Sequence, residues 1–319
     1  MSTTTILIVC PVPRGSRKGN RVTAERWKNH LQAMGHRVRI AGDWNGQRCD
    51  VLLALHAKKS YEAIRRYRRE RPSGPLVVAL TGTDIYRDLP KGGKPLQSLR
   101  WADRLIALHD AICDDLPAEV HAKVRVIHQS TLPVSPRPNQ SQTTFDVCVL
   151  GHLRHEKDPL RTAMALRLLR DLPDLRLTQA GQALSPRYAA WARAMMQHDR
   201  RYRWLGEIPR RQALRLLASS HLMVISSRME GGANVVSEAI VNGVPILASD
   251  ISGNRGLLGP DYPGYFPVGD TASLARLLRR TCVDSDYRQA LTMRIAALAP
   301  RFTPESETAA LKALLRELV

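Results

Sequence analysis

The chain has 319 residues, of which 44% are hydrophobic, and this length and composition predict two globular domains with ordinary cores. No apolar run approaches the roughly 18 residues of a membrane span. The apolar segment 6–10 is too short for a signal-peptide core, so we expect a cytoplasmic protein without stable membrane insertion. Five scattered cysteines without a C-x-x-C pair favour reduced, buried thiols over a disulfide framework or a zinc site.

The formal net charge of +19 leaves three kinds of partner open: nucleic acid, anionic membrane surfaces and small anionic substrates. Arginines cluster at 65–69, 200–203 and 279–280, which are widely separated positions on or beside predicted helices. We interpret these clusters as solvated outer faces. Only three phenylalanines are available for base stacking, so nucleic-acid binding is the less favoured interpretation.

The first half of the chain alternates short apolar strands with helices. Strands are predicted at 6–10, 38–41, 51–55, 76–80, 105–108 and 124–127, and helices at 23–34 and 61–70. Such alternation is typical of a parallel sheet covered by helices on both faces.

A segment rich in Pro, Ser and Gln, 132–142, interrupts this pattern and indicates a linker. Strands then follow at 145–150, 175–180, 203–205, 222–226 and 245–248, and helices at 159–170, 186–197, 210–219, 234–242, 271–281 and 304–319. The sequence therefore predicts an α/β protein with two doubly wound, Rossmann-like domains facing a central cleft. We expect an N-terminal domain at 1–135, a linker at 136–143, a C-terminal domain at 144–303, and a terminal helix at 304–319 packing back on the N-terminal domain.

The most informative motif follows the buried strand at 222–226. It reads Glu230-Gly231-Gly232-Ala233-Asn234-Val235-Val236-Ser237-Glu238, with Gly243-Val244-Pro245 soon after. A strand, a glycine-rich bend and a helix N-terminus bring free N–H groups together, which suits an anion such as a phosphate. Carboxylates beside such a site suit hydroxyl groups, so the motif predicts a nucleotide-sugar site.

This motif resembles the donor-binding signature of the retaining GT-B glycosyltransferases numbered family 4. In that family the first glutamate lies against the donor sugar and the second holds the ribose hydroxyls, which would give these roles to Glu230 and Glu238. The resemblance covers the whole chain in layout. It implies a GT-B fold with an acceptor-binding N-terminal domain and a nucleotide-sugar-binding C-terminal domain.

A narrower resemblance is to the selenosugar synthases of selenoneine biosynthesis. It rests on the segments Asn20–Ala24, Ala54–Ala57, Ala79–Asp88 and Gly151–Pro159. It implies transfer of a glycosyl group from UDP-N-acetylglucosamine or UDP-glucose to selenophosphate. A C–Se bond forms, and UDP and phosphate are released.

Three departures from the general family argue against an ordinary sugar acceptor. The family's His-Gly-x-Asp is Thr81-Gly82-Thr83-Asp84 here, and its Asn-Gly after the sixth strand is Gln129-Ser130. Its Gly-Arg-Leu-x-x-x-Lys becomes Gly151-His152-Leu153-Arg154-His155-Glu156-Lys157, which keeps the lysine and leaves the arginine's role to Arg154 or His152. An acceptor already deprotonated at neutral pH, such as selenophosphate, needs no strong general base, which agrees with the missing histidine.

The donor site must stabilise the charge that builds on the departing diphosphate with cations and N–H dipoles, because no metal or cofactor is expected. The predicted catalytic residues are Glu230, Lys157 and Arg154. The predicted donor-binding residues are Glu238, Gly231, Gly232, Ala233, Asn234, Val235 and His152. Asn234 could also cap the helix that it begins.

The acceptor site is predicted at a basic strand-to-helix junction and at two further strand ends. Its residues are Gly15, Arg17, Lys18, Asn20, Arg21, His56, Thr81, Gly82 and Thr83. Cations and glycines at such a junction suit a small anion, although a merely basic loop is nearly as good an interpretation. His56 could equally be a structural histidine, and Asp84 is expected to fix its loop by hydrogen bonds.

The sequence therefore predicts a selenosugar synthase that uses a UDP-sugar and selenophosphate. The alternative is an ordinary UDP-sugar-dependent GT-B glycosyltransferase with a carbohydrate or lipid acceptor. A basic nucleic-acid-binding protein is the second alternative.

Overall fold

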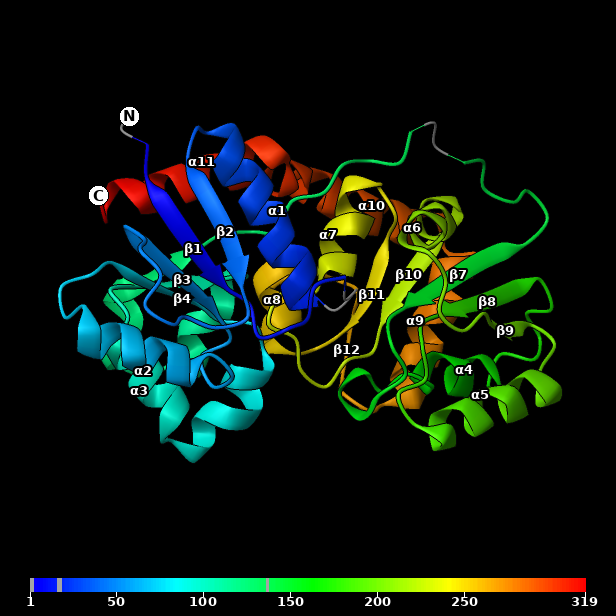
Figure 1. The fold of residues 1–319 in the computed structure, drawn as a ribbon. Coiled ribbons are helices and arrows are strands. Elements are labelled where there is room, and N and C mark those ends of the chain that lie inside the picture. Colours follow the sequence, from blue (N-terminus) through cyan, green and yellow to red (C-terminus); the bar gives the residue numbers. More distant parts are fainter. Residues whose placement is uncertain (1–2, 16–18, 136–137) are drawn as a thin grey trace. The chain divides into compact units, whose positions relative to one another are not determined.

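The computed structural model describes residues 3–15, 19–135 and 138–319, which form two compact α/β units (Figure 1). Unit 1 comprises Met1–Ser130, the short segment Glu230–Asn234 and the C-terminal Pro304–Val319. Unit 2 comprises Thr131–Met229 and Val235–Thr303. The glycine-rich part of the sequence motif therefore clusters with unit 1, although most of its neighbours in the chain belong to unit 2.

Unit 1 contains a parallel sheet that has six strands among the described residues, in the order β2-β1-β3-β4-β5-β6. The strands are β1 (Thr5–Val9), β2 (Arg37–Ala41), β3 (Val51–Leu55), β4 (Leu76–Ala79), β5 (Arg104–Ala107) and β6 (Val124–Val126). Strands β3 and β4 are buried at every residue, as expected for strands covered on both faces.

Helices cover both faces of this sheet (Figure 1). They are α1 (Gly19–Ala33), α2 (Tyr61–Glu70), α3 (Lys94–Trp101) and α11 (Pro304–Arg316), with short helices at Asp84–Asp88, Leu89–Lys91, Asp110–Asp115 and Ala118–Lys123. Alternate residues of β1 point to opposite faces: Ile6 and Ile8 pack with α1 and α11, whereas Leu7 and Val9 pack with α2 and α3. The terminal helix is thus part of the core of unit 1.

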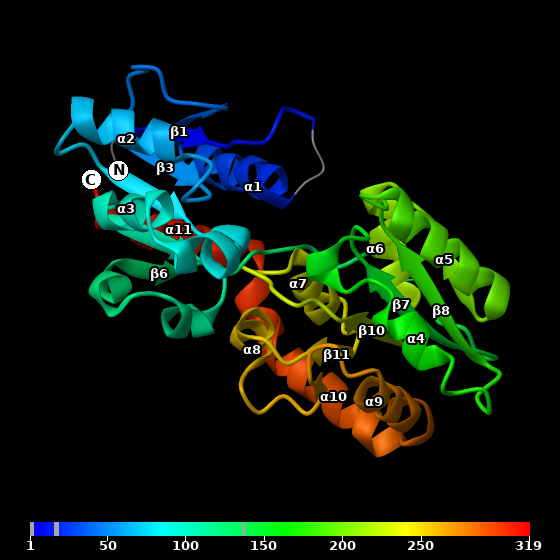
Figure 2. The same cartoon turned by 90° about the horizontal axis from the view of Figure 1, so that it is seen from below.

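Unit 2 contains a second parallel sheet, again of six strands within the described ranges, in the order β12-β11-β10-β7-β8-β9. The strands are β7 (Phe145–Leu150), β8 (Leu175–Ala180), β9 (Tyr202–Trp204), β10 (Leu222–Ile225), β11 (Ile246–Ser249) and β12 (Tyr265–Phe266). Strand β10 lies between β7 and β11 (Figure 2), so the chain reverses its direction of travel across the sheet after β9. Such a reversal is where doubly wound sheets bind ligands.

The helices of unit 2 lie on both faces of its sheet. They are α4 (Arg161–Leu166), α5 (Pro186–His198), α6 (Arg210–Ser219), α7 (Asn234–Val241), α8 (Ser252–Leu258), α9 (Thr271–Val283) and α10 (Ser285–Leu298), with short helices at His155–Lys157 and Ala299–Phe302. In Figure 1, α6 and α7 lie on one side of the strands, and α4, α5 and α9 lie on the other. Each unit therefore has a parallel sheet with helices on both faces, which confirms the prediction of two doubly wound domains.

The helix expected at 159–170 is wrong in extent, because α4 ends at Leu166. The guanidinium of Arg201 donates to the carbonyl oxygens of Leu166 at 2.8 Å and Leu172 at 3.1 Å, and also to that of Leu169. Arg201, which directly precedes β9, thereby satisfies carbonyl groups that a longer helix would have paired with its own amides.

Two arginine clusters that we interpreted as solvated faces contain half-buried members with structural roles. The side chain of Arg201 is only 13% exposed and pairs with Asp199 at 2.7 Å. Arg68, on α2, donates to Asp103 at 2.9 Å and to the Trp101 carbonyl oxygen at 2.7 Å. Part of the large positive charge therefore serves packing within each unit rather than any partner.

The unit boundary falls between Ser130 and Thr131, a few residues before the expected domain end at 135. Residues beyond it already bond within unit 2: the Thr131 amide donates to Phe302 O at 3.1 Å, and the Val134 amide donates to Asn242 Oδ1 at 2.8 Å. All five cysteines are free thiols, and Cys10, Cys49 and Cys148 are buried. In the part of the chain that the structure describes, no helix is long and apolar enough to cross a membrane.

Candidate active site

The segment Glu230–Asn234 packs directly on strand ends of unit 1. A Cβ atom on Gly231 would lie 2.5 Å from the Thr81 carbonyl carbon, and one on Gly232 would lie 2.4 Å from Leu108 Cβ. Thr81 follows β4 and Leu108 follows β5, so the segment covers the carboxyl ends of these two neighbouring strands. Glu230 itself is buried at this place. The structure thus brings the predicted sugar-binding glutamate beside the predicted acceptor turn.

Asp84 fixes this turn, as the sequence predicted. Its Oδ1 accepts from the Thr81 amide at 2.9 Å and from the Thr81 hydroxyl at 3.3 Å, while Oδ2 accepts from the Ala57 amide at 3.0 Å. Gly82 has a φ of +106°, a conformation that favours glycine. The carboxylate therefore ties the end of β3 to the end of β4.

His56 lies at the end of β3 and is fully buried, with a φ of 72° that a non-glycine residue rarely adopts. Its Nε2 is 3.1 Å from Thr83 Oγ1, and its Nδ1 accepts from the Lys59 amide at 3.4 Å. Burial lowers the pKa of His56, and the nearby carboxylate of Asp84 opposes this only in part. Burial thus favours the uncharged form of the ring, which lies between the Lys59 amide and the Thr83 hydroxyl.

The basic junction before α1 is only partly described. Arg17 and Lys18 lie outside the described residues, and Gly15 is exposed with a φ of +81°. Arg21 pairs with Glu25 one turn along α1, and the Asn20 carbonyl oxygen accepts from the thiol of Cys10 at 3.7 Å. Of the described residues of this predicted loop, Arg21 thus pairs within α1 and Asn20 contacts Cys10 through its backbone.

Unit 2 has a cavity at the carboxyl ends of β7 and β10. It is a small pocket that opens to solvent, and its internal volume of about 20 Å³ has room for a group the size of a water molecule. It is lined by residues from the ends of β7, β8 and β10 and from the turn after β7: Val149, Leu150, Gly151, Lys157, Pro159, Gln179, Val224, Ile225, Ser226 and Ser227. Its polar members are hydroxyls, an amide and one cation, which suits a phosphate or sugar hydroxyl.

The Lys157 turn is held firmly to the end of β10. Ser226 Oγ donates to Asp158 O at 2.9 Å and to Lys157 O at 3.3 Å, and the Arg228 amide donates to Glu156 O at 2.8 Å. Asp158 adopts a left-handed conformation with a φ of 42°, which ends the short helix His155–Lys157. Lys157 is also the only lysine between Lys123 and Lys312, in a region where arginine supplies the other permanent cations. A lysine presents a compact point charge that suits a single phosphate oxygen.

Arg154 and His152 differ from Lys157, because neither belongs to the described residues that line the cavity. Arg154 Nε is buried and lies 3.9 Å from Glu156 Oε2. Both side chains are half-buried in the segment that leads from β7 to Lys157. The structure therefore groups only Lys157 of these three with the strand ends.

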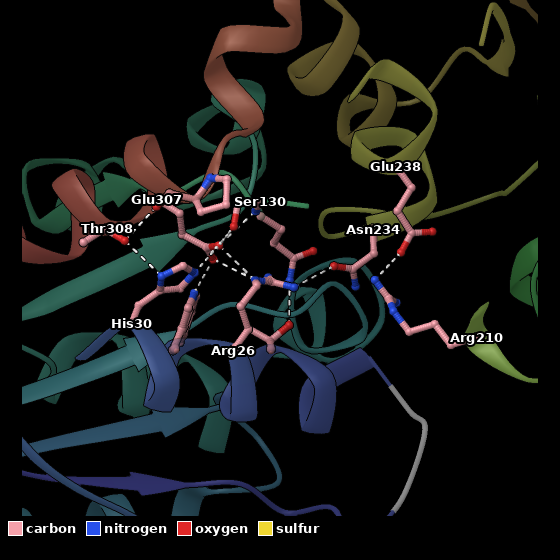
Figure 3. Close-up of polar contacts among 12 residues, drawn as sticks. Arg26, His30, Ser130, Arg210, Asn234, Glu238, Glu307 and Thr308 are labelled. Atoms are coloured by element: carbon pink, nitrogen blue, oxygen red, sulfur yellow. Dashed lines mark hydrogen bonds and ion pairs between the residues drawn. The ribbon is translucent and has the colours of Figure 1, made fainter. Parts of the chain in front are cut away.

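Glu238 lies in the interior of α7 with its side chain 10% exposed, and Arg210 of α6 pairs with it at 2.7 Å (Figure 3). Of the remaining motif residues, Ala233 is buried and Val235 is half-buried. Sequence reasoning missed Arg210, Ser226 and Ser227. The two serines directly follow a buried strand, which is a usable signal, whereas Arg210 is one of many arginines and nothing in the sequence singles it out.

Two doubly wound parallel sheets, one of them with a pocket at its strand ends, are the architecture of the GT-B glycosyltransferases. Residues 134–296 match the family described as glycosyl transferases group 1, and the chain belongs to this family. It is therefore a glycosyltransferase.

Similar proteins agree with this assignment. The glycosyltransferase 1 domain-containing protein 1 of Xenopus tropicalis is 25% identical over 314 residues, covering 89% of this chain and 88% of that protein. HepE from Anabaena, solved with UDP and glucose, superposes with a TM-score of 0.75 at 17% identity, covering 98% of this chain and all of that one. Sucrose-phosphate synthase from Thermosynechococcus elongatus gives a TM-score of 0.74 at 16% identity, covering 99% of both chains.

Proposed function

We propose that this glycosyltransferase uses a UDP-sugar as donor, either UDP-N-acetylglucosamine or UDP-glucose. The observation that carries the proposal is the cavity beside Lys157, at the point where the unit 2 sheet reverses its strand order. The similar HepE fold has been solved with UDP and with UDP-glucose, which supports the same donor class here.

The donor is held by groups already described. The ammonium of Lys157 would lie against the diphosphate and stabilise the negative charge that grows as UDP departs. Glu238 would accept hydrogen bonds from the ribose hydroxyls, and Glu230 would contact the donor sugar, as the resemblance to the retaining family 4 enzymes implies. With N–H dipoles and a fixed cation available, we expect transfer without a metal ion.

We further propose that selenophosphate is the acceptor. This finer assignment is supported by the resemblance of Ala79–Asp88 and Gly151–Pro159 to selenosugar synthases. It is also supported by His56, whose buried ring is hydrogen-bonded to Thr83 and to the Lys59 amide, so that its two nitrogens are engaged within the protein and poorly placed to deprotonate a sugar hydroxyl. A selenium nucleophile that is already ionised needs no such base.

The proposed reaction balances as two displacements. The bond between sugar C1 and the β-phosphate oxygen breaks, the oxygen keeps the electron pair, and UDP leaves. Selenium supplies the pair for the new C1–Se bond. Water then attacks phosphorus, the P–Se bond breaks, and inorganic phosphate departs from the selenosugar.

The test is incubation of the protein with each UDP-sugar and selenophosphate under anaerobic, reducing conditions, followed by mass spectrometry. We expect UDP, phosphate and a seleno-glycoside, and no product with the Lys157→Ala variant. UDP release that depends on a carbohydrate or lipid acceptor, but not on selenophosphate, would overturn the selenophosphate assignment and leave the donor assignment standing. Absence of turnover with every UDP-sugar and acceptor would remove the donor assignment as well.

A further inference from the structure

The most heavily bonded buried carboxylate in the described part of unit 1 is Glu307, in the first turn of α11. Its side chain is fully buried, and it accepts from Trp27 Nε1 at 2.7 Å and from the Ser130 amide at 2.9 Å, as well as from the Ser130 hydroxyl. His30 Nε2 lies 3.4 Å away. This carboxylate therefore fixes the start of α11 on α1.

Arg26 of α1 joins this carboxylate to the segment Glu230–Asn234, which we call the glycine loop. Its Nε lies 3.1 and 2.9 Å from the two oxygens of Glu307, and its NH1 donates to Asn234 Oδ1 at 3.2 Å (Figure 3). The guanidinium is 16% exposed and lies between the two partners. A planar fork of this kind holds both partners in one fixed geometry.

Gln129 makes a second connection to the same loop. With its amide nitrogen turned toward the loop, it donates to Gly232 O at 3.0 Å and to Asn234 Oδ1 at 3.1 Å. Its oxygen then accepts from Arg26 NH2 at 3.3 Å and from Thr23 Oγ1 at 2.6 Å. Gln129 and Ser130, which depart from the family's Asn-Gly, thus serve the loop and Glu307 respectively.

We propose that Arg26 is a positioning residue for the glycine loop. Glu307 holds Arg26 in place, and Gln129 contributes a second contact to the loop. Two consecutive glycines give this loop more backbone freedom than other residues would, so it needs an external restraint to keep one conformation. Both contacts are made to oxygen atoms of the loop, so the restraint does not use the N–H groups that the donor phosphates would need. The consequence for catalysis rests on the function proposed above.

The test uses the full-length protein and four variants: Arg26→Lys, Asn234→Ala, their double mutant, and Asn234→Asp. Lysine keeps a charge beside Glu307 but cannot bridge to the loop, whereas aspartate keeps an acceptor for Arg26. We expect Arg26→Lys and Asn234→Ala each to lower kcat/KM for the UDP-sugar about tenfold. The double mutant should show the same tenfold loss in kcat/KM, because both substitutions remove one shared interaction. Asn234→Asp should keep the slow amide exchange that the parent shows in the loop, because it retains the acceptor for Arg26.

A second readout does not depend on activity. Hydrogen exchange of the amides of residues 230–235 should become faster in Arg26→Lys and Asn234→Ala, while exchange in β1 and β3 stays as in the parent. Arg65→Lys, an exposed arginine of α2 paired with Glu62, is the matched control and should change neither readout. Additive losses, or unchanged exchange in the loop, would overturn the proposal. If the parent turned over no UDP-sugar, the proposed function would fail and the exchange result would still decide the positioning role.

Discussion

Gly231 and Gly82 lie in backbone contact: a Cβ atom on Gly231 would be 2.3 Å from the Gly82 nitrogen and 2.4 Å from its Cα. A Cβ on Gly82 would in turn be 2.7 Å from the Gly231 nitrogen. Real side chains do not approach backbone this closely, so both positions require glycine for the loop to lie on the Thr81–Thr83 turn. This pair joins a residue predicted for the donor to one predicted for the acceptor.

Gly231→Ala should therefore displace the glycine loop from the turn. We expect transfer activity to fall at least about tenfold, since overpacking against backbone is typically unfavourable by 1–3 kcal/mol and here acts on the site itself. Steady-state kinetics with the UDP-sugar would measure the loss. Gly42→Ala is the control, because nothing lies within 4 Å of the added atom there; equal activities of the two variants would contradict the predicted displacement.

Lys157 should act mainly on the chemical step. We expect Lys157→Ala to lower kcat by roughly a hundredfold or more and to weaken UDP binding less, because the charge on the leaving diphosphate grows in the transition state. Lys157→Arg should recover only part of kcat, since a planar fork replaces a point charge. Lys312→Ala, at an exposed position on α11, is the control. A rise in KM with an unchanged kcat would assign Lys157 to ground-state binding instead.

Glu238 should distinguish ribose from deoxyribose. In titration calorimetry, we expect the parent to bind UDP more tightly than 2′-deoxy-UDP by about tenfold, the scale of one hydrogen bond to a charged group. Glu238→Ala should weaken UDP binding and remove the difference between the two nucleotides. Arg210→Ala should keep that difference, because it removes an exposed partner of Glu238 and leaves the carboxylate itself in place. Persistent discrimination in Glu238→Ala would exclude the ribose role.

Glu307 should make folding stability sensitive to acid. Burial opposes its ionisation, but the hydrogen bond from His30, the charge of Arg26 and the bonds from Ser130 prevail and lower its pKa from 4.5 to about 2. A carboxyl group whose pKa is depressed in the folded state stabilises the fold above its unfolded pKa and loses that contribution as pH falls through the folded pKa. By linkage this contribution is about 3 kcal/mol at neutral pH and disappears between roughly pH 4.5 and pH 2.

Denaturant unfolding at a series of pH values would measure this effect. Glu307→Gln should be less stable than the parent at pH 7 and should lose less stability in the acid window. Glu305→Gln, at an exposed position two residues earlier on the same helix, should follow the parent curve. Parallel curves for the parent and Glu307→Gln would show that this carboxylate does not control the acid sensitivity.

Most strands were predictable, because many of them are apolar runs bounded by polar or glycine-rich segments, whereas the two-residue strand β12 was not predicted. Three helices were not predicted, namely the short helices α3 and α8 and the longer helix α10, and the helix at 159–170 was predicted too long. In α10 only Tyr287, Leu291 and Ile295 are buried, a stripe too narrow to stand out in the sequence. The early end of α4 depends on Arg201, which is far away in the chain and reaches its carbonyl groups only in the folded unit.

The candidate site also contains residues that the sequence predicted and residues that it did not. Strand-end positions identified Lys157, His56 and the Thr81–Thr83 turn, because parallel sheets place function beyond their carboxyl ends. Sequence reasoning could not find Arg26 or Glu307, since Arg26 lies 281 residues from Glu307 and 208 residues from Asn234, and each looks like an ordinary surface charge of an amphipathic helix.

The succession of strands and helices along the chain, the glycine-rich motif with Glu230 and Glu238, and the position of Lys157 could be identified from the sequence alone, because local pattern and spacing encode them. Which residues meet the glycine motif was decided only by the tertiary structure. Gly231 rests on Gly82, and Asn234 is held by Arg26, because long-range packing brings together segments that share no local pattern.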